Sequence, residues 1–109
     1  MGRPPVWLHA DLLPTNLLVR DGRLVGVLDF GGMATGDPAY DVTPAWQLLD
    51  RDTRPAFLGM VGAGEAMKRR ARGLVVSHGV GALSYYLHSN PSMVAMARRG
   101  IREVLADVA

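Results

Sequence analysis

Residues 7–41, WLHADLLPTNLLVRDGRLVGVLDFGGMATGDPAYD, hold the pattern that decides the fold. Within this stretch His9, Asp11 and Asn16 follow the spacing H-x-D-x-x-x-x-N, and Asp29 begins a D-F-G triplet. Two carboxylates and one amide are hard oxygen donors, the kind of group that binds Mg²⁺ in proteins. The spacing therefore predicts that three polar side chains surround a single cation site.

A hairpin is expected between Asn16 and Asp29. Two apolar runs flank the Asp21-Gly22 dipeptide, a strong signal for a two-residue turn. Counting back from that turn places Asn16 opposite Val27, and the alternation of side chains then puts Asp29 on the same face as Asn16. Such diagonal neighbours lie roughly 7–8 Å apart, close enough to share one ion. The expected strands are residues 17–20 and 23–28.

Each of these residues also has an ordinary structural interpretation. An aspartate before a strand is commonly a cap or turn residue, and Asn16 follows Pro14-Thr15 as turn chemistry would require. On this ordinary interpretation, each of the six motif residues needs its own explanation. Phosphoryl transfer, in contrast, requires all six together. The conjunction favours a phosphotransferase ancestry.

The quoted segment resembles the catalytic core of the aminoglycoside phosphotransferase family, which is related to choline kinases and protein kinases. Two later segments, LLDRDTRPAF at 48–57 and SYYLHSNPSMVAMARRGIREVLAD at 84–107, resemble the C-terminal helices of the same family. The resemblance implies ATP and Mg²⁺ as cofactors, and transfer of the γ-phosphate to a hydroxyl group of a small molecule. Ala10, Leu13 and Thr15 replace residues that are commonly Gly, His and Gly, which leaves the acceptor and its binding residues unassigned.

The resemblance also assigns roles to individual residues. It implies that Asp11 is the catalytic base and that Asn16 and Asp29 bind the metal and, through it, the nucleotide. His9 would orient the loop, and Asp41 would brace it by hydrogen bonding from the following helix.

The expected fold is α+β, a mostly helical C-terminal part of a kinase-like lobe that forms one domain over 1–109. Residues 1–36 would supply the catalytic loop, hairpin and D-F-G-like segment, and 37–109 about four helices. Val6–Leu8 should be a short buried strand, and both hairpin faces are apolar, so protein should cover both. The helices are expected at about 38–49 with a kink at Pro44, 55–61, 65–88 with two apolar stripes, and from 91 onward after an Asn90 cap. Gly79 and Gly81 predict close helix packing, whereas Arg98, Arg99, Arg102 and Glu103 are expected to face water.

Composition limits the other classes of function. The formal net charge is +2, the sequence contains no cysteine, and 49% of its residues are hydrophobic. Disulfides are excluded, no run approaches a membrane span, and a cytoplasmic location is expected. The apolar excess predicts a partner surface, covered by a missing N-terminal lobe or by another chain.

A kinase-like enzyme also needs a glycine-rich loop and a strand lysine over the phosphates, and neither precedes His9. The chain is therefore expected to begin inside the C-terminal lobe and to have little or no kinase activity alone. One alternative is a degenerate, non-catalytic module for binding or oligomerisation. The other is a basic nucleic-acid module around Lys68, Arg69, Arg70 and Arg72, which the lack of aromatic stacking residues there disfavours.

Overall fold

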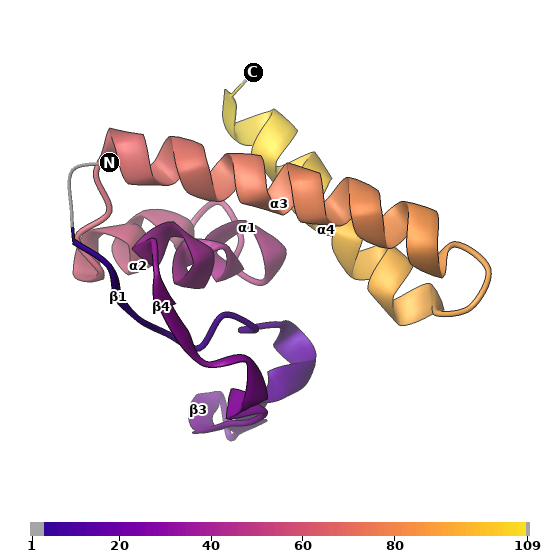
Figure 1. Cartoon of the computed structure of the whole chain (residues 1–109), viewed down its shortest axis with the longest axis horizontal. Coiled ribbons are helices and arrows are strands. Elements are labelled where there is room, and N and C mark those ends of the chain that lie inside the picture. The colour runs from indigo at the N-terminus through magenta and orange to yellow at the C-terminus, as the bar shows by residue number, and fades with distance from the viewer. Residues whose placement is uncertain (1–3, 109) are drawn as a thin grey trace.

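The computed structural model describes residues 4–108 and is α+β, as expected (Figure 1). Two antiparallel two-stranded sheets lie beside a helical body, and the long helices α3 and α4 cross that body on the side away from the hairpin. The strands are β1 (Val6–Leu8), β2 (Leu17–Arg20), β3 (Arg23–Val27) and β4 (Ala34–Gly36), and the helices are α1 (Pro44–Gln47), α2 (Arg54–Met60), α3 (Glu65–Tyr86) and α4 (Pro91–Val108).

The hydrophobic core lies in the helical body. Trp46 on α1 and Val75 on α3 are its largest fully buried side chains, and Met67, Ala71 and Val104 pack around them. On α3, the buried residues Met67, Ala71 and Val75 recur at a spacing of four, so one stripe of the helix is buried as expected. The second stripe is not: Val80 and Leu87 are half exposed, so the prediction of a helix covered on two sides is wrong for this chain.

Helix α3 approaches α4 at two glycines. A Cβ at Gly79 would lie 2.9 Å from Ile101 of α4, and one at Gly100 would lie 3.0 Å from Val75. The predicted close packing is thus confirmed for Gly79. It is wrong for Gly81, where a Cβ would meet no atom within 4 Å.

Prolines and caps divide the helical part. The helix expected over 38–49 is instead a 3-10 helix, Pro38–Val42, followed by α1, which starts at Pro44. A proline at that position cannot donate the hydrogen bond that would continue the preceding helix. Asn90 accepts a hydrogen bond from the Met93 amide at 3.2 Å and caps α4 as predicted.

Strand β1 forms where expected but is mostly exposed. Only Leu8 is buried, whereas 72% of Trp7 is exposed. The strand pairs with β4 along one edge, and β4 falls in a stretch expected to be a loop. Three residues are too few for a period-two pattern to reveal such a strand, which forms because Leu8 pairs with Ala34.

The hairpin has the predicted Asp21-Gly22 turn, with both residues at positive φ. Its register differs from the expectation by one residue, because Val25 is a bulge and leaves Leu17, not Asn16, opposite Val27. The bulge places Val27 on the same face of the hairpin as Leu17, whereas uninterrupted alternation from the turn would place these two residues on opposite faces.

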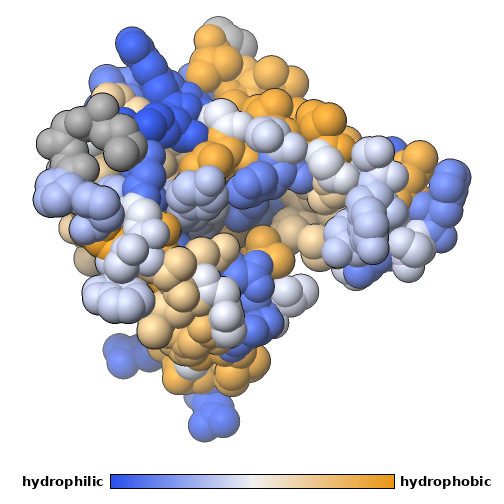
Figure 2. All heavy atoms as spheres, in the orientation of Figure 1, coloured by the Kyte–Doolittle hydropathy of each residue, from blue (hydrophilic) through white to orange (hydrophobic). Residues whose placement is uncertain are grey.

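Much of the hairpin is uncovered. Val19 and Leu24 are more than half exposed, and Figure 2 shows apolar residues gathered around the hairpin at the bottom of the view. The expectation that protein covers both faces is therefore wrong for the described residues 4–108. None of the helices in that range is long and apolar enough to cross a membrane.

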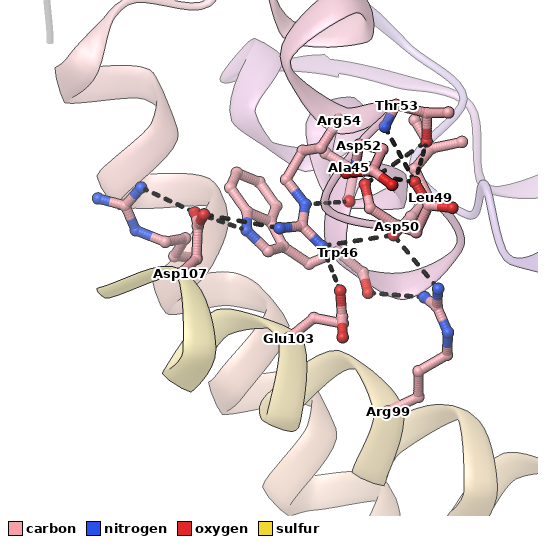
Figure 3. A network of polar contacts seen from close by, with 11 residues as sticks. Ala45, Trp46, Leu49, Asp50, Asp52, Thr53, Arg54, Arg99, Glu103 and Asp107 are labelled. Carbon is pink, nitrogen blue, oxygen red and sulfur yellow. Dashed lines mark hydrogen bonds and ion pairs between the residues drawn. The ribbon is translucent and has the colours of Figure 1, made fainter. Parts of the chain in front are cut away.

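A polar network joins α1 and α2 to α4, and the sequence did not indicate it (Figure 3). The buried Arg54 donates to the Ala45 carbonyl at 2.6 Å and to the Glu103 carboxylate at 2.5 Å. Arg99 donates to the carbonyl of Trp46 at 3.0 Å. Arg99 and Glu103 were expected to face water but are only partly exposed, because these α4 side chains reach carbonyl and guanidinium groups from elsewhere in the chain.

Candidate functional site

Asp41 holds the backbone of the loop that carries Asp11. Its carboxylate accepts a hydrogen bond from the His9 amide at 2.7 Å and another from the Ala10 amide at 2.9 Å. Asp41 lies in the 3-10 helix that packs on the core, so the loop is tied directly to the helical body. Two hydrogen bonds to one carboxylate are charge-assisted and stronger than neutral ones.

The bend between His9 and Asp11 is strained. Ala10 has a φ of 69°, in the left-handed region, where a side chain costs roughly 1–2 kcal/mol. The hydrogen bond from Ala10 to Asp41 holds the residue in this conformation.

His9 connects the loop to the end of the hairpin. Its ring is buried; Nε2 lies 2.7 Å from the Leu28 carbonyl, and Nδ1 accepts from the Asp11 amide at 3.1 Å. Since a carbonyl only accepts, the neutral ring carries its proton on Nε2. The ring also meets Phe30 edge-on, with 4.6 Å between centroids.

Asn16 and Asp11 are in contact. The Asn16 Nδ2 donates to the Asp11 carbonyl at 2.9 Å and to the Asp11 Oδ2 at 3.2 Å. With Nδ2 donating twice, the Asn16 Oδ1 is the group of this side chain that can still accept a hydrogen bond or bind a cation. Asp11 Oδ1 accepts no hydrogen bond from any residue in 4–108.

Asp29 is brought to the same region through Leu28. The Leu28 amide donates to the Asn16 carbonyl at 2.7 Å, while the Leu28 carbonyl contacts His9. Leu28 makes both contacts, and the Cα atom of Asp29, the next residue, lies about 3.8 Å from the Cα atom of Leu28. The strand-alternation argument does not apply there, because the bulge changes the register and Asp29 has a φ of 60°. No hydrogen bond or ion pair joins the Asp29 side chain to another residue within 4–108, and the residue is exposed.

The site offers oxygen donors of the kind that Mg²⁺ binds. Asp29 and the Asn16 Oδ1 supply one carboxylate and one amide oxygen without described partners, and Mg²⁺ commonly takes one or two protein ligands with phosphates and waters completing its shell. Within residues 4–108 no group of three His, Cys, Asp or Glu side chains could hold a metal alone. The donor set thus fits an ion that a phosphate ligand helps to bind, not a closed protein site.

Asp37 ties the loop region to α3 in a way the sequence did not reveal. It caps the 3-10 helix by accepting a hydrogen bond from the Ala39 amide at 3.0 Å, and it also binds Arg70 through two hydrogen bonds of 2.6 and 3.1 Å. The Arg70 guanidinium lowers the pKa of Asp37 below its usual value, and Asp37 raises the pKa of Arg70. Asp37 and Arg70 are 33 residues apart, so no local spacing could have paired them.

Comparisons with known proteins show the family and the fold of this chain. A family model described as "phosphotransferase enzyme family" matches residues 1–74. Among solved structures, ADP-bound aminoglycoside phosphotransferase APH(2'')-Ib matches with 20% identity and a TM-score of 0.60, over 94% of this chain and 38% of that one. The structure of a gentamicin complex of APH(2'')-IIa matches with 23% identity and a TM-score of 0.57, over 94% of this chain and 36% of that one. At these identities the likeness is one of fold, and this chain spans under two fifths of either structure. No curated protein matches the sequence.

Proposed function

Because the chain belongs to the phosphotransferase enzyme family, we propose that it carries the catalytic loop and metal-binding residues of an ATP-dependent kinase that acts on a hydroxyl group of a small molecule. The observation that carries this proposal is the connected loop in which Asp41, His9, Asp11 and Asn16 hold one another, with Asp29 one residue beyond Leu28. Phosphoryl transfer depends almost wholly on positioning and charge, which such a loop supplies.

Each residue has a defined task in this proposal. The Asp11 carboxylate accepts the proton of the acceptor hydroxyl at Oδ1, while Asn16 fixes the other oxygen. His9 holds the Asp11 amide, and Asp41 holds the two amides before it. Asn16 and Asp29 would hold Mg²⁺, and a bound Mg²⁺ would neutralise charge on the phosphates of ATP.

The 109-residue chain alone is expected to turn over ATP poorly. Its single lysine, Lys68, lies on α3 and forms an ion pair with Glu65, so the chain supplies no strand lysine for the phosphates. The two solved structures with a similar fold are more than twice as long, and ADP is bound in one of them. Nucleotide binding is therefore a better test than turnover.

Two exposed aspartates make a matched pair for that test. Asp29 and Asp21 lie at the two ends of strand β3, both at positive φ, where asparagine is also tolerated. Titration of ADP in the presence of Mg²⁺, followed by calorimetry, is expected to show binding that Asp29→Asn weakens at least tenfold and Asp21→Asn leaves unchanged. Equal affinity in both variants, or binding that does not need Mg²⁺, would refute the proposed metal role of Asp29.

A second candidate, a non-catalytic module that binds another chain, is favoured by one observation. A cavity of about 500 Å³ lies between the hairpin and α1–α2, and its lining is almost entirely apolar. The hairpin contributes four residues to it: Leu17, Val19, Leu24 and Val27. Such a surface suits a partner chain or an N-terminal lobe.

Association would separate the two candidates. If the module interpretation holds, the chain self-associates in sedimentation experiments and Val19→Lys, a change in the apolar cavity, abolishes this without altering ADP binding. Val25→Lys is a control on the same hairpin, since Val25 is exposed and does not line that cavity. A monomer at high concentration would exclude self-association.

A further inference from the structure

A second hollow lies beside the N-terminal end of α3, at the far end of the helical body from the C-terminal turn of that helix. It has a volume of about 470 Å³ and is formed by the residues before and within α2, the first two turns of α3, and the end of α4. None of its lining residues belongs to the loop between residues 9 and 41. The hollow is therefore separate from the candidate catalytic site.

The lining of this hollow is strongly basic. It contains two acidic residues, Glu65 and Asp107, and five basic ones: Arg51, Arg54, Lys68, Arg69 and Arg72. Figure 2 shows strongly hydrophilic residues gathered over the start of α3, beside the end of α4. The surplus of positive charge over negative favours an anionic occupant.

The acidic residues do not use up the basic ones. Glu65 pairs with Lys68 at 3.5 Å, and Asp107 lies 3.6 Å from Arg54 and 3.7 Å from Arg72, too far for a hydrogen bond. The side chains of Arg51 and Arg69 make no ion pair or hydrogen bond with any residue in 4–108, and none of the Arg72 guanidinium protons is donated within that range. Arginine matches phosphate oxygens with two parallel hydrogen bonds, so these free donors fit a phosphate group well.

The floor of the hollow is rigid. Trp46 is fully buried, its indole donates to Asp107 at 3.1 Å, and the guanidinium carbons of Arg54 and Arg72 lie 5.8 and 6.0 Å from the ring centre. Arg54 is fixed further by Glu103 and by the Ala45 carbonyl (Figure 3). A prearranged cationic floor costs little further ordering when a ligand binds.

We propose that this hollow binds a small phosphate-bearing anion, with Arg69, Arg51 and Arg72 as its ligands. Its volume falls in the range of small-molecule sites, roughly 300–1,000 Å³, and its concave shape suits a compact polyphosphate. Nucleic acid is disfavoured, because the lining holds no aromatic side chain on which a base could stack. The site is independent of the proposed catalytic function, and it gives Arg69 and Arg72, two members of the basic cluster at the start of α3, a role in binding an anion.

The test is a titration of the full 109-residue chain with inorganic tripolyphosphate in the absence of Mg²⁺. Trp46 fluorescence reports on the hollow once the exposed Trp7 is replaced by phenylalanine. Saturable binding is expected, and Arg69→Glu should weaken it about tenfold or more, because it removes a charge-assisted contact. Arg98→Glu makes the same change of charge on an exposed part of α4 outside the hollow and should alter the affinity less than twofold.

Arg51→Glu serves as a second variant if Arg69→Glu fails to fold by circular dichroism. Asp29→Asn should leave tripolyphosphate binding intact, which separates this site from the proposed nucleotide site. Equal weakening by Arg69→Glu and Arg98→Glu, or the absence of saturation, would overturn the proposal. Tighter binding of a DNA duplex than of tripolyphosphate, with the same dependence on Arg69, would also overturn it in favour of nucleic acid.

Discussion

The loop region, residues 4–36, and the helical body, residues 37–108, are held together by different forces. Within the loop region only Leu8 and His9 are buried, whereas the body contains Trp46, Val75 and the rest of the core. The loop takes its shape from hydrogen bonds to Asp41 and from the ring of His9. The residues proposed for chemistry therefore lie on the part that has no core of its own, and they depend on the body for their positions.

The largest effect is expected from the body. Arg54→Met removes a buried guanidinium and leaves Glu103 unpaired at the α2–α4 contact. Breaking one side of a buried pair costs about 3–5 kcal/mol, a large share of the stability of a small domain. Urea denaturation should show this loss, and the loop should unfold together with the body.

Arg102→Met is the control, since Arg102 is exposed on the same α4. It should change the free energy of unfolding by less than about 0.5 kcal/mol. A loss below 1 kcal/mol in Arg54→Met would mean that the network does not hold the body together.

A smaller, local effect is expected from Asp41→Asn. The variant loses the negative charge that accepts from the His9 and Ala10 amides, contacts worth roughly 1.5–3 kcal/mol. Hydrogen exchange at these two amides should accelerate about 10- to 100-fold, while amides in the middle of α3 stay protected. Similar acceleration in both regions would show that the loop and the body unfold as one cooperative unit, and would contradict a loop held locally by Asp41.

The contact between the 3-10 helix Pro38–Val42 and α3, both in the body, should depend on pH through Asp37. Arg70 lowers the pKa of Asp37 in the folded state, so the stabilisation is present above the unfolded pKa, about 3.9, and is lost as the pH falls through the folded pKa. Asp37→Asn, which can still cap the 3-10 helix, should cost about 1 kcal/mol at pH 7 because the pair is partly exposed. The two proteins should become equally stable in strong acid.

Denaturation at several pH values checks this, with Asp52→Asn as a control at an exposed aspartate whose carboxylate has no partner in the described range. A difference between wild type and Asp37→Asn that stays constant down to strong acid would argue against the ion pair as its cause.

The smallest effect is expected at Ala10. Ala10→Gly relieves a left-handed conformation worth roughly 1–2 kcal/mol and adds about 0.5–1 kcal/mol of backbone entropy to the unfolded chain. A net stabilisation of about 0.5 kcal/mol should appear in thermal denaturation. Destabilisation by this change would show that the alanine methyl group has a packing role in the loop.

The sequence predicted most of the helices and the hairpin, because their signals are local. The Asp21-Gly22 turn, the Asn90 cap and the spacing of Met67, Ala71 and Val75 each require only neighbouring residues. The family resemblance is confirmed as well. Strand β4 was missed because its only cause is pairing with β1, which lies 30 residues earlier at Val6↔Gly36 and 26 residues earlier at Leu8↔Ala34.

The structure corrects the predicted geometry of the candidate site, whereas the roles of its residues stay predictions. One bulge at Val25 shifted the pairing, so the argument that placed Asn16 and Asp29 on one face through Val27 is wrong, and the hydrogen bonds of Leu28 join these segments instead. The Arg54–Glu103 and Asp37–Arg70 pairs span 49 and 33 residues. Neither pair has a signal in local spacing, since each arises only when distant elements pack.

The most direct test of the central claim, that Asn16 and Asp29 share one cation site, is paramagnetic broadening of amide NMR signals by Mn²⁺ in the presence of ADP. Mn²⁺ substitutes for Mg²⁺ at oxygen sites. The amide signals of Asn16 and of residues 29–31 are expected to broaden first, and those of Asp50 and the Asp21 turn are expected to persist. Broadening centred on either of those aspartates, with Asn16 and Asp29 unaffected, would contradict it.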